Sequence, residues 1–384
     1  MNKKIGIIGF GQRASGVLEN ELKFFPELEI GAIADVDLEK VKETAKKNPL
    51  LNLDEIHFYT DAIEMLDKEK LDGVFVATRC DLHAGFAVEV LKRNIPLFLE
   101  KPVVTSIEDY EMLKKAVDEN EAGGITSFPL RITVLLQKAK EVYDSGVLGT
   151  LSQIQAYNNV PYGRVYYKDW YHNDSITGGL FLQKATHDVD YINYVIGMKP
   201  VEVCAMESKM IFKGDKPEEM QCPDCPEYET CIESSKVVVE KLGDNPRGNH
   251  CSFAKSTGNQ DSATIMMRYE NGMHTVYTQN FVARHLAGRR GMRMIGHRGT
   301  LEFDWNTNEL LVFSHDECKV DRYVVKPNTG GAHSGGDYAL IRDFLALMNG
   351  DKSVSSLNEG LASAYICMKA RESAQTRQFM TLEY

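Results

Sequence analysis

The sequence predicts an α/β protein of two domains, a doubly wound parallel sheet followed by a domain with a large, mainly antiparallel sheet. Its 384 residues are more than one hydrophobic core ordinarily organises. Up to about residue 128, short apolar runs alternate with helical segments, as they do where helices connect parallel strands. From about residue 150, longer runs alternate apolar with polar residues and end at turn sequences, a pattern typical of antiparallel sheets.

The first domain is expected to span residues 1–128. Its candidate strands are short and apolar, and they are residues 4–8, 28–34, 73–77, 96–99 and 124–127. Helical segments such as residues 39–47 and 83–93 fit between them. Strand and helix repeating at this spacing predict a parallel, doubly wound sheet.

The second domain is expected to span residues 129–384. Its candidate strands alternate in polarity, and they are residues 153–157, 201–212, 262–269, 274–280, 300–303 and 309–313. Residues 213–258 are rich in Pro, Gly, Cys and charge and read as an insertion between two strands. Two helices, residues 337–348 and 357–376, are expected to close the chain.

Composition excludes several classes of partner. A net charge of −11 leaves no basic excess to neutralise phosphates, so neither nucleic acid nor an anionic membrane surface is an expected partner. No apolar run approaches the roughly 18 residues of a membrane span, and the N-terminus does not read as a secretory signal. We therefore expect a cytoplasmic protein with reduced thiols.

The first strand leads into a glycine-rich turn that suits a dinucleotide. Gly9 and Gly11 permit a tight turn and close approach of a pyrophosphate, and Ala14 lets the following helix sit against the strand. Asp35 ends the second strand, where a carboxylate can accept the ribose hydroxyls of adenosine. No arginine follows it directly, so NAD is favoured over NADP. Plain turn roles for the glycines and for Asp35 remain the alternative.

A second chemically rich stretch begins at the glycine pair Gly178-Gly179 and reads as a helix. One face is apolar and consists of Leu182, Ala185, Val189, Ile192 and Ile196. A second face carries Lys184, His187, Asp188 and Tyr191. This polar face either meets water, as on an ordinary amphipathic helix, or lines a site.

Together these segments resemble the Gfo/Idh/MocA oxidoreductase family, the group of glucose-fructose oxidoreductase and inositol dehydrogenase. The pieces that carry the resemblance are KIGIIGFGQRA, VFVATRCDLH, the tripeptide EKP, SFPLRITVLLQKAKEVYDSGVLGTL, the GG-entered helix with His187 and Asp190, and RRGMRMIGHRGTLEFD. Their order and spacing over residues 3–348 are more specific than any single piece.

The resemblance implies an N-terminal Rossmann dinucleotide-binding domain and assigns roles to individual residues. Arg131 often reaches the active site, and His187 matches the catalytic-site histidine. Lys101 matches the lysine near the reacting carbon. Cofactor contacts are expected from Gly9, Phe10, Gly11, Gln12, Arg13, Asp35, Ala77, Thr78, His83, Glu100 and Lys101.

Two positions depart from the family pattern. Arg79 follows Thr78 where proline is usual, and Gln183 stands where an aspartate usually precedes the histidine by four residues. Because glutamine accepts no proton at neutral pH, that role passes to His187 or is absent. Lys101 and Lys184 can stabilise a developing alkoxide. Asp188 or Asp190 could orient the His187 ring.

A sugar-like substrate is suggested by aromatic and polar side chains along residues 157–172. The contacts we single out are Arg131, Tyr157, Trp170, Gln183, Lys184 and His333. Aromatic faces stack on sugar C–H groups, although packing in a loop explains the same residues equally well. Asp337 is expected to cap the helix that begins there.

The inserted segment contains a cysteine cluster. Cys222 and Cys225 have the two-residue spacing that lets both bind one ion, and Cys231 and Cys251 follow. A structural zinc ion, reduced free cysteines, and a disulfide or iron–sulfur site all remain open; His250 competes with Cys251 as a ligand.

The sequence thus predicts an NAD-dependent oxidoreductase that acts on a secondary alcohol of a sugar, glycoside or cyclitol. The alternatives are an NAD-dependent glycosidase acting by transient oxidation and elimination, and a non-catalytic cofactor-binding sensor. We expect a small-molecule substrate and, from the exposed face of the antiparallel sheet, a homodimer or homotetramer.

Overall fold

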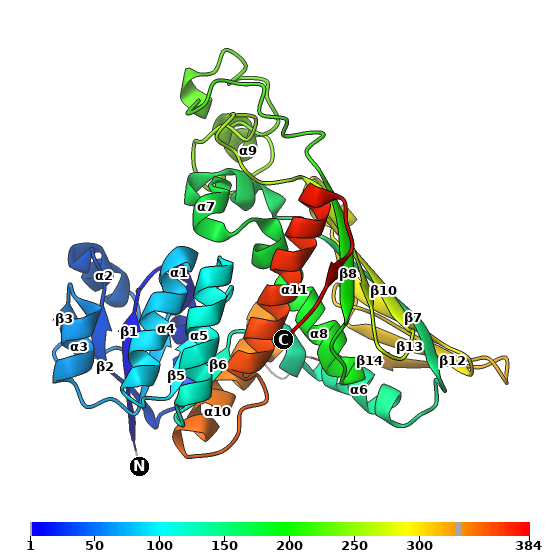
Figure 1. The fold of residues 1–384 in the computed structure, drawn as a ribbon. Helices are drawn as coiled ribbons and strands as arrows, with labels where there is room; N and C mark the ends of the chain where they lie inside the picture. The colour runs from blue at the N-terminus through cyan, green and yellow to red at the C-terminus, as the bar shows by residue number, and fades with distance from the viewer. Residues whose placement is uncertain (1, 327–331) are drawn as a thin grey trace. The chain divides into compact units, whose positions relative to one another are not determined.

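The computed structural model describes residues 2–326 and 332–384. The chain forms two compact units (Figure 1): the first comprises Met1–Leu136 and Pro327–Tyr365, and the second comprises Gln137–Lys326 and Ile366–Tyr384. The first unit therefore takes in a C-terminal segment that we expected in the second domain. That segment contains the predicted helix at residues 337–348.

The first unit contains a six-stranded sheet in which every neighbouring pair is parallel. Its strands are β1 Lys3–Ile8, β2 Leu28–Ala34, β3 His57–Tyr59, β4 Gly73–Val76, β5 Leu97–Leu99 and β6 Gly124–Thr126. The order is β3-β2-β1-β4-β5-β6, so the chain reverses its direction across the sheet between β1 and β4. Ligands of open α/β sheets bind at this reversal, beyond the carboxyl ends of the strands. The predicted doubly wound domain is confirmed.

The helices of this unit are α1 Gln12–Glu21, α2 Leu38–Ala45, α3 Ala62–Lys68, α4 His83–Lys92, α5 Ile107–Glu119 and α10 Gly336–Met348. Helix α10 belongs here because its apolar side packs into the core of the sheet. Phe344 meets Phe98 of β5 edge to face, with ring centroids 5.6 Å apart. A side chain at Gly73 would come within 2.7 Å of Phe344 and Met348. The sequence shows which face of this helix is apolar, but not which sheet covers it.

The second unit contains a nine-stranded sheet of order β14-β13-β12-β11-β7-β10-β9-β8-β15. Its strands are β7 Leu151–Asn159, β8 Glu202–Ser208, β9 Ser262–Arg268, β10 His274–Asn280, β11 Arg289–Gly296, β12 Gly299–Asp304, β13 Glu309–Ser314, β14 Val320–Val324 and β15 Met380–Thr381. Neighbours are antiparallel except β7 and β10, which run parallel. The large, mainly antiparallel sheet is confirmed.

The other helices are α6 Val134–Asp144, α7 Asp174–Thr177, α8 Thr186–Ile196, α9 Ser235–Glu240 and α11 Leu357–Thr376, which contributes to both units. Helix α8 runs along the nine-stranded sheet (Figure 1). Its Asp188 accepts hydrogen bonds from side chains of β7, β10 and β11, which fixes the helix on that face. No helix in the described part of the chain combines the length and apolar character that crossing a membrane requires.

The predicted insertion, residues 213–258, connects β8 to β9 and extends beyond the end of β8 (Figure 1). It contains one short 3-10 turn, Cys222–Asp224, and helix α9. Aromatic contacts anchor its base. The rings of Tyr167 and Phe212 lie 4.0 Å apart, and Phe253 packs 5.5 Å from Phe212.

Candidate active site

The turn after β1 has the form that a dinucleotide requires. Gly9 has φ +85°, and a side chain there would come within 2.8 Å of the backbone nitrogen of Thr78. Gly11 is the N-cap of α1, and a side chain at this position would point into open space. The first turn of α1 carries no acidic residue, so its backbone N–H groups can bind a pyrophosphate. The neighbouring Gln12 is exposed.

Asp35 follows β2 at the same edge of the sheet. One carboxylate oxygen accepts the N–H of Phe10 at 2.8 Å, and the other accepts the N–H of Asp37 at 3.1 Å. Each carboxylate oxygen can accept a further bond, so two ribose hydroxyls can still be bound. The adjacent Val36 is exposed and uncharged, and offers nothing to a 2′-phosphate.

Arg13 is committed to protein carboxylates. Its Nε donates to Glu100 at 2.7 Å, and its two terminal nitrogens donate to Asp337 at 3.1 and 2.6 Å. Burial by itself would lower the pKa of Arg13, but Glu100 and Asp337 outweigh this effect and raise it. The guanidinium of Arg13 thus holds the glycine turn to the residue after β5 and to α10, and its expected contact with the cofactor stays a prediction. Ser127 also donates to Glu100, at 2.8 Å.

The expectation that Asp337 caps α10 is wrong. The N-cap is Gly335, and the Asp337 carboxylate is drawn instead to Arg13 and to the ring of His333, whose Nδ1 lies 3.0 Å away. Burial on its own would raise the pKa of Asp337, yet His333 and Arg13 hold it well below its usual range. His333 itself is exposed beside this cluster.

Arg131 is buried and binds within the first unit. It donates to the carbonyl of Val354 at 2.8 Å and to the carboxylate of Glu359 at 2.9 Å. These partners belong to the start of α11 and the loop before it. The geometry therefore gives Arg131 a structural task, and its expected contact with substrate stays a prediction.

His83 connects the two loops that follow β4 and β5. Its Nδ1 lies 2.8 Å from the carbonyl of Pro102, and its Nε2 lies 3.2 Å from the carbonyl of Thr78. Burial lowers the pKa of this histidine. Ala77 and Thr78 form the loop after β4, while Lys101 follows Glu100 after β5 and is half-buried. His83 thus positions the loops that carry the expected cofactor contacts.

In the second unit, the stretch after Gly178-Gly179 differs from the predicted single helix. Phe181–Ala185 forms a π-helical turn, and α8 begins only at Thr186. Every residue from 177 to 193 is buried, so the second face does not meet water. Such single π turns occur frequently at functional sites and change which side chains share a face.

Lys184 lies in the π turn and is 4% exposed. Its ammonium donates to the hydroxyl of Tyr162 at 2.6 Å and lies 4.8 Å from the centre of the same ring. Within the described residues, no carboxylate comes within 4.0 Å of it. Tyr162 is 54% exposed, so the pair forms a polar group with one side open to solvent. Tyr162 lies in the aromatic run 157–172, but the sequence did not single it out.

Asp188 does not orient His187. Its carboxylate accepts two bonds from Arg290, both at 2.8 Å, one from Tyr277 at 3.0 Å and one from Asn158 at 3.1 Å. All of these donors are in the sheet. Asp190 is buried on the same helix, so it is the remaining candidate for orienting the imidazole.

The other expected substrate contacts lie in the second unit and make protein contacts. Gln183 donates to the carbonyl of Thr177 at 3.0 Å. The Tyr157 hydroxyl is 3.4 Å from Asp304, and burial together with this carboxylate raises the pKa of Tyr157 to about 12. Trp170 stacks on Tyr171 with 4.0 Å between ring centroids. Their roles toward substrate stay predictions.

The four cysteines of the insertion come together. Cys222, Cys225, Cys231 and Cys251 all line one cavity of about 10 Å³, and none forms a disulfide. Lys168 lines the same cavity. The cysteine cluster was predicted from the sequence, but Lys168 was not. The position of Lys168 among Tyr166, Tyr167 and Trp170 indicates that it would be buried.

Comparison with protein families gives two matches that together cover most of the chain. Residues 3–124 match the model described as the oxidoreductase family, NAD-binding Rossmann fold. Residues 136–302 match the model described as the GFO/IDH/MocA C-terminal domain. The expected family, the oxidoreductase class and the NAD-binding fold are confirmed.

Individual proteins similar to this chain are also oxidoreductases by name. The Bacillus subtilis protein named "Putative oxidoreductase YteT" is 28% identical over 382 residues, covering 89% of this chain and 88% of that protein. Myo-inositol 2-dehydrogenase of Thermotoga maritima is 25% identical, covering 82% and 78%. Levoglucosan dehydrogenase, solved with NADH and levoglucosan, has a TM-score of 0.78 at 19% identity, covering 99% of both chains. The last comparison shows a shared fold.

Proposed function

Because the chain belongs to the Gfo/Idh/MocA family of oxidoreductases, we propose that it is an NAD-dependent dehydrogenase that oxidises a secondary alcohol of a sugar, glycoside or cyclitol. Relatives named for inositol and a structural neighbour named for levoglucosan support this substrate class. All of these compounds are small, rich in hydroxyl groups and uncharged. The proposed substrate is therefore bound by hydrogen bonds and aromatic contacts rather than by ion pairs.

The observation that carries this proposal is the Lys184–Tyr162 pair. A buried ammonium without a carboxylate is costly unless another oxygen binds it. The Tyr162 hydroxyl occupies one of its three N–H donors at 2.6 Å, which leaves donors for a substrate oxygen. Those donors stabilise the negative charge that develops on an alcohol oxygen during oxidation.

The residues divide the chemistry between the two units. In the first unit, the turn at Gly9 and Gly11 fits a pyrophosphate and Asp35 fits the ribose hydroxyls. The bound nicotinamide supplies the acceptor for hydride. In the second unit, we assign His187 as the base that takes the hydroxyl proton, since an imidazole exchanges protons near neutral pH. Lys184 binds the same oxygen.

The test is a panel of sugars, cyclitols and aryl glycosides incubated with the purified protein and NAD. Reduced cofactor and free oxidised sugar should appear together. Aglycone release without net cofactor reduction would show the glycosidase instead, for which the Lys184–Tyr162 pair offers hydrogen-bond donors to the leaving group. Tight NAD binding with no turnover of any compound would show a sensor.

The role of His187 is tested on the best substrate of that panel. We expect His187→Asn to lower kcat roughly 10²–10⁴-fold, the usual contribution of a general base. NAD affinity should be unchanged, because the nucleotide contacts lie in the other unit. Unchanged kcat would refute the assignment of the base.

A further inference from the structure

The inserted segment gathers four cysteine side chains that the proposed oxidation does not use. Cys222, Cys225, Cys231 and Cys251 line a single cavity of about 10 Å³ together with Lys168. A cavity of this size has room for about one water-sized particle. The first pair comes from a 3-10 turn, whereas Cys251 comes from the return of the chain toward β9. The cavity thus joins the two ends of an otherwise irregular segment.

Lys168 is the unusual member of this cluster, because its side chain is 0% exposed. Its ammonium donates to the sulfur of Cys222 at 3.3 Å and to the carbonyl of His250 at 2.8 Å. Over residues 2–326 and 332–384, no carboxylate lies within 4.0 Å of this nitrogen. A fully buried ammonium requires a compensating negative charge, and neutral thiols do not supply one.

The carboxylate that lines the cavity already has cationic partners. Glu233 also lines the cavity, but its two oxygens bind Arg164 at 3.0 Å and Arg284 at 3.3 Å. Arg164 and Arg284 therefore flank this carboxylate, and Lys168 lines the same cavity. The exposed Asp244 reaches only Arg164, at 3.6 Å. Together these side chains carry three positive and two negative charges, and the net charge of +1 favours an anionic group inside the cavity.

We propose that the four cysteine sulfurs bind one zinc ion and that Lys168 positions and neutralises the resulting thiolate complex. A divalent ion with four thiolates carries a net charge of −2, part of which the Lys168 ammonium offsets, and four released protons pass to solvent. The cavity accommodates a single ion rather than a cluster of several iron and sulfide ions. The site would hold together residues 222–251, a segment with few regular hydrogen-bonded elements.

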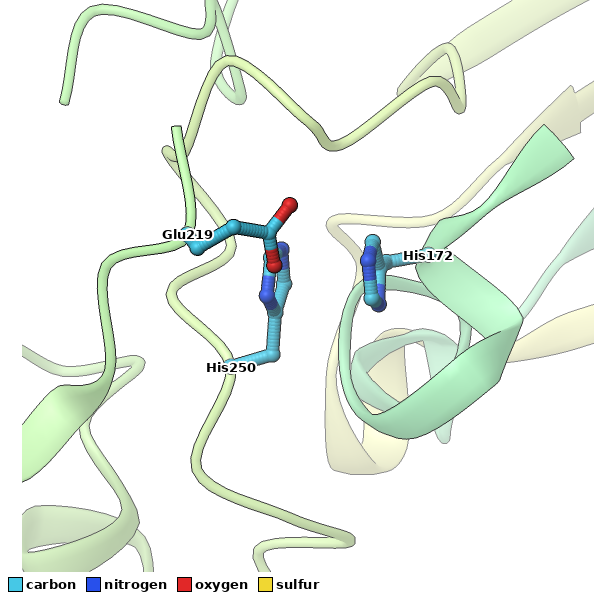
Figure 2. Close-up of side chains that lie close together, drawn as sticks. All are labelled: His172, Glu219 and His250. Atoms are coloured by element: carbon cyan, nitrogen blue, oxygen red, sulfur yellow. The ribbon is translucent and has the colours of Figure 1, made fainter. Parts of the chain in front are cut away.

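A second set of ligand atoms in the described residues lies close by, but its geometry does not suit a metal. His172, Glu219 and His250 place ligand atoms within 4.8 Å of one another. Figure 2 shows both imidazole rings edge-on; they stack at 3.5 Å with 10° between their planes. The nitrogen lone pairs of each ring lie in its plane, and two nearly parallel planes do not let them converge on one ion. In addition, His250 Nε2 lies 3.1 Å from Thr257 Oγ1.

The cysteine sulfurs do not form such a close set within the described residues. Sulfurs bound to one zinc ion lie about 2.3 Å from it, so the thiol side chains must rotate toward the centre of the cavity when the ion binds. This makes ion binding and ordering of the insertion a single event. The predicted consequence is a large gain in thermal stability when metal is added to metal-free protein.

The test measures metal content and stability of the full-length protein. We expect about one zinc ion per chain by elemental analysis. Cobalt substitution should give the intense thiolate-to-cobalt absorption of a tetrahedral four-sulfur site. Cys225→Ser and Cys231→Ser should lose the metal, while Cys318→Ser, which changes an exposed cysteine outside the cavity, should retain it.

Two further variants separate the alternatives. His172→Gln should leave metal content unchanged; loss of the ion would assign it to the histidine set and overturn the proposal. Lys168→Met should weaken zinc affinity at least about tenfold in a chelator competition, the scale of one charge-assisted hydrogen bond. Metal-free wild-type protein whose melting temperature does not change with added zinc would also overturn the proposal, as would iron with acid-labile sulfide.

Discussion

The partly buried arginines Arg13 and Arg290 and the buried lysines Lys168 and Lys184 differ in their partners. Arg13 binds Glu100 and Asp337, and Arg290 binds Asp188, each through hydrogen bonds of 3.1 Å or less. In contrast, Lys184 binds a phenol and Lys168 binds a sulfur and a carbonyl. The fold itself balances the charge of the arginines, but not that of the lysines.

This difference distinguishes cations with a structural role from cations that can still bind a ligand. The charge of a cation that is paired with a carboxylate is already balanced. Such a pair holds elements of the fold together, as Arg290 holds α8 on the sheet. A buried cation whose partners are neutral still has the capacity to bind an anion or an oxygen on which charge develops. We therefore assign the arginines to the fold, Lys184 to the substrate and Lys168 to a thiolate complex.

The largest expected effect is a loss of stability when the ion pair between Arg290 and Asp188 is broken. Arg290→Met leaves the Asp188 carboxylate buried without a cation and should lower the free energy of unfolding by about 3–5 kcal/mol. The double variant with Asp188→Asn should recover much of this loss. Urea denaturation measures both. The control is Arg298→Met, whose exposed pair with Asp316 should contribute about 1 kcal/mol or less; equal losses would remove the distinction.

The second-largest expected effect is a loss of turnover, without a loss of stability, when Lys184 is replaced. Lys184→Met should lower kcat roughly 10²–10³-fold, because a donor to the developing oxyanion is removed. The free energy of unfolding should not fall, since an ammonium without a carboxylate no longer has to be buried. The matched control is Lys199→Met: Lys199 also lies over a tyrosine ring, Tyr384 at 5.3 Å, but is exposed. A large stability loss in Lys184→Met would contradict its assignment.

Asp35, like these lysines, is a charged residue without a partner of opposite charge among the described residues. Its carboxylate accepts hydrogen bonds from two backbone N–H groups and has no cation within 4.0 Å in the described chain. Replacing it with serine and Val36 with arginine should weaken NAD binding about 10- to 100-fold and strengthen NADP binding. Fluorescence titration with both nucleotides measures the change. An equal loss for both would show that Asp35 serves only the turn.

The smallest expected effect is on how the free energy of unfolding depends on pH. Burial lowers the pKa of His83 below its ordinary 6.5, so the unfolded chain takes up the proton first as the pH falls. Its contribution to stability is complete above pH 6.5 and is lost as the pH falls toward the lowered value. His83→Gln keeps a donor for the loop carbonyls but does not titrate. Its unfolding free energy should depend less on pH in that window than the wild type; identical slopes would contradict this.

Much of the fold could be predicted, because strands and long helices carry a local pattern. The strand Leu28–Ala34 and the helix Leu357–Thr376 were predicted with the bounds that the structure shows. The edge strand β3 was missed because His57–Tyr59 is only partly buried, whereas the equally short β5 and β6 are fully buried apolar runs. The π turn was also missed, since a local pattern of 3.6 residues cannot reveal an extra residue that tertiary packing imposes.

The candidate site could be predicted in its residue types but not in its pairings. Gly9, Asp35 and His187 could be found because each stands at a fixed place relative to a strand or helix. The Tyr162 contact of Lys184 joins positions 22 residues apart across irregular turns, and Arg13 pairs with Asp337 across 324 residues. Such pairings follow from the packing of elements, which no local pattern contains.

We propose that the chain transfers hydride from a sugar-like alcohol to NAD. The most direct measurement uses a substrate from the panel with deuterium on the carbon to be oxidised, followed by mass spectrometry of the cofactor. We expect reduced cofactor carrying one deuterium, formed together with the oxidised sugar. Substrate consumption with the deuterium absent from the cofactor pool would contradict it.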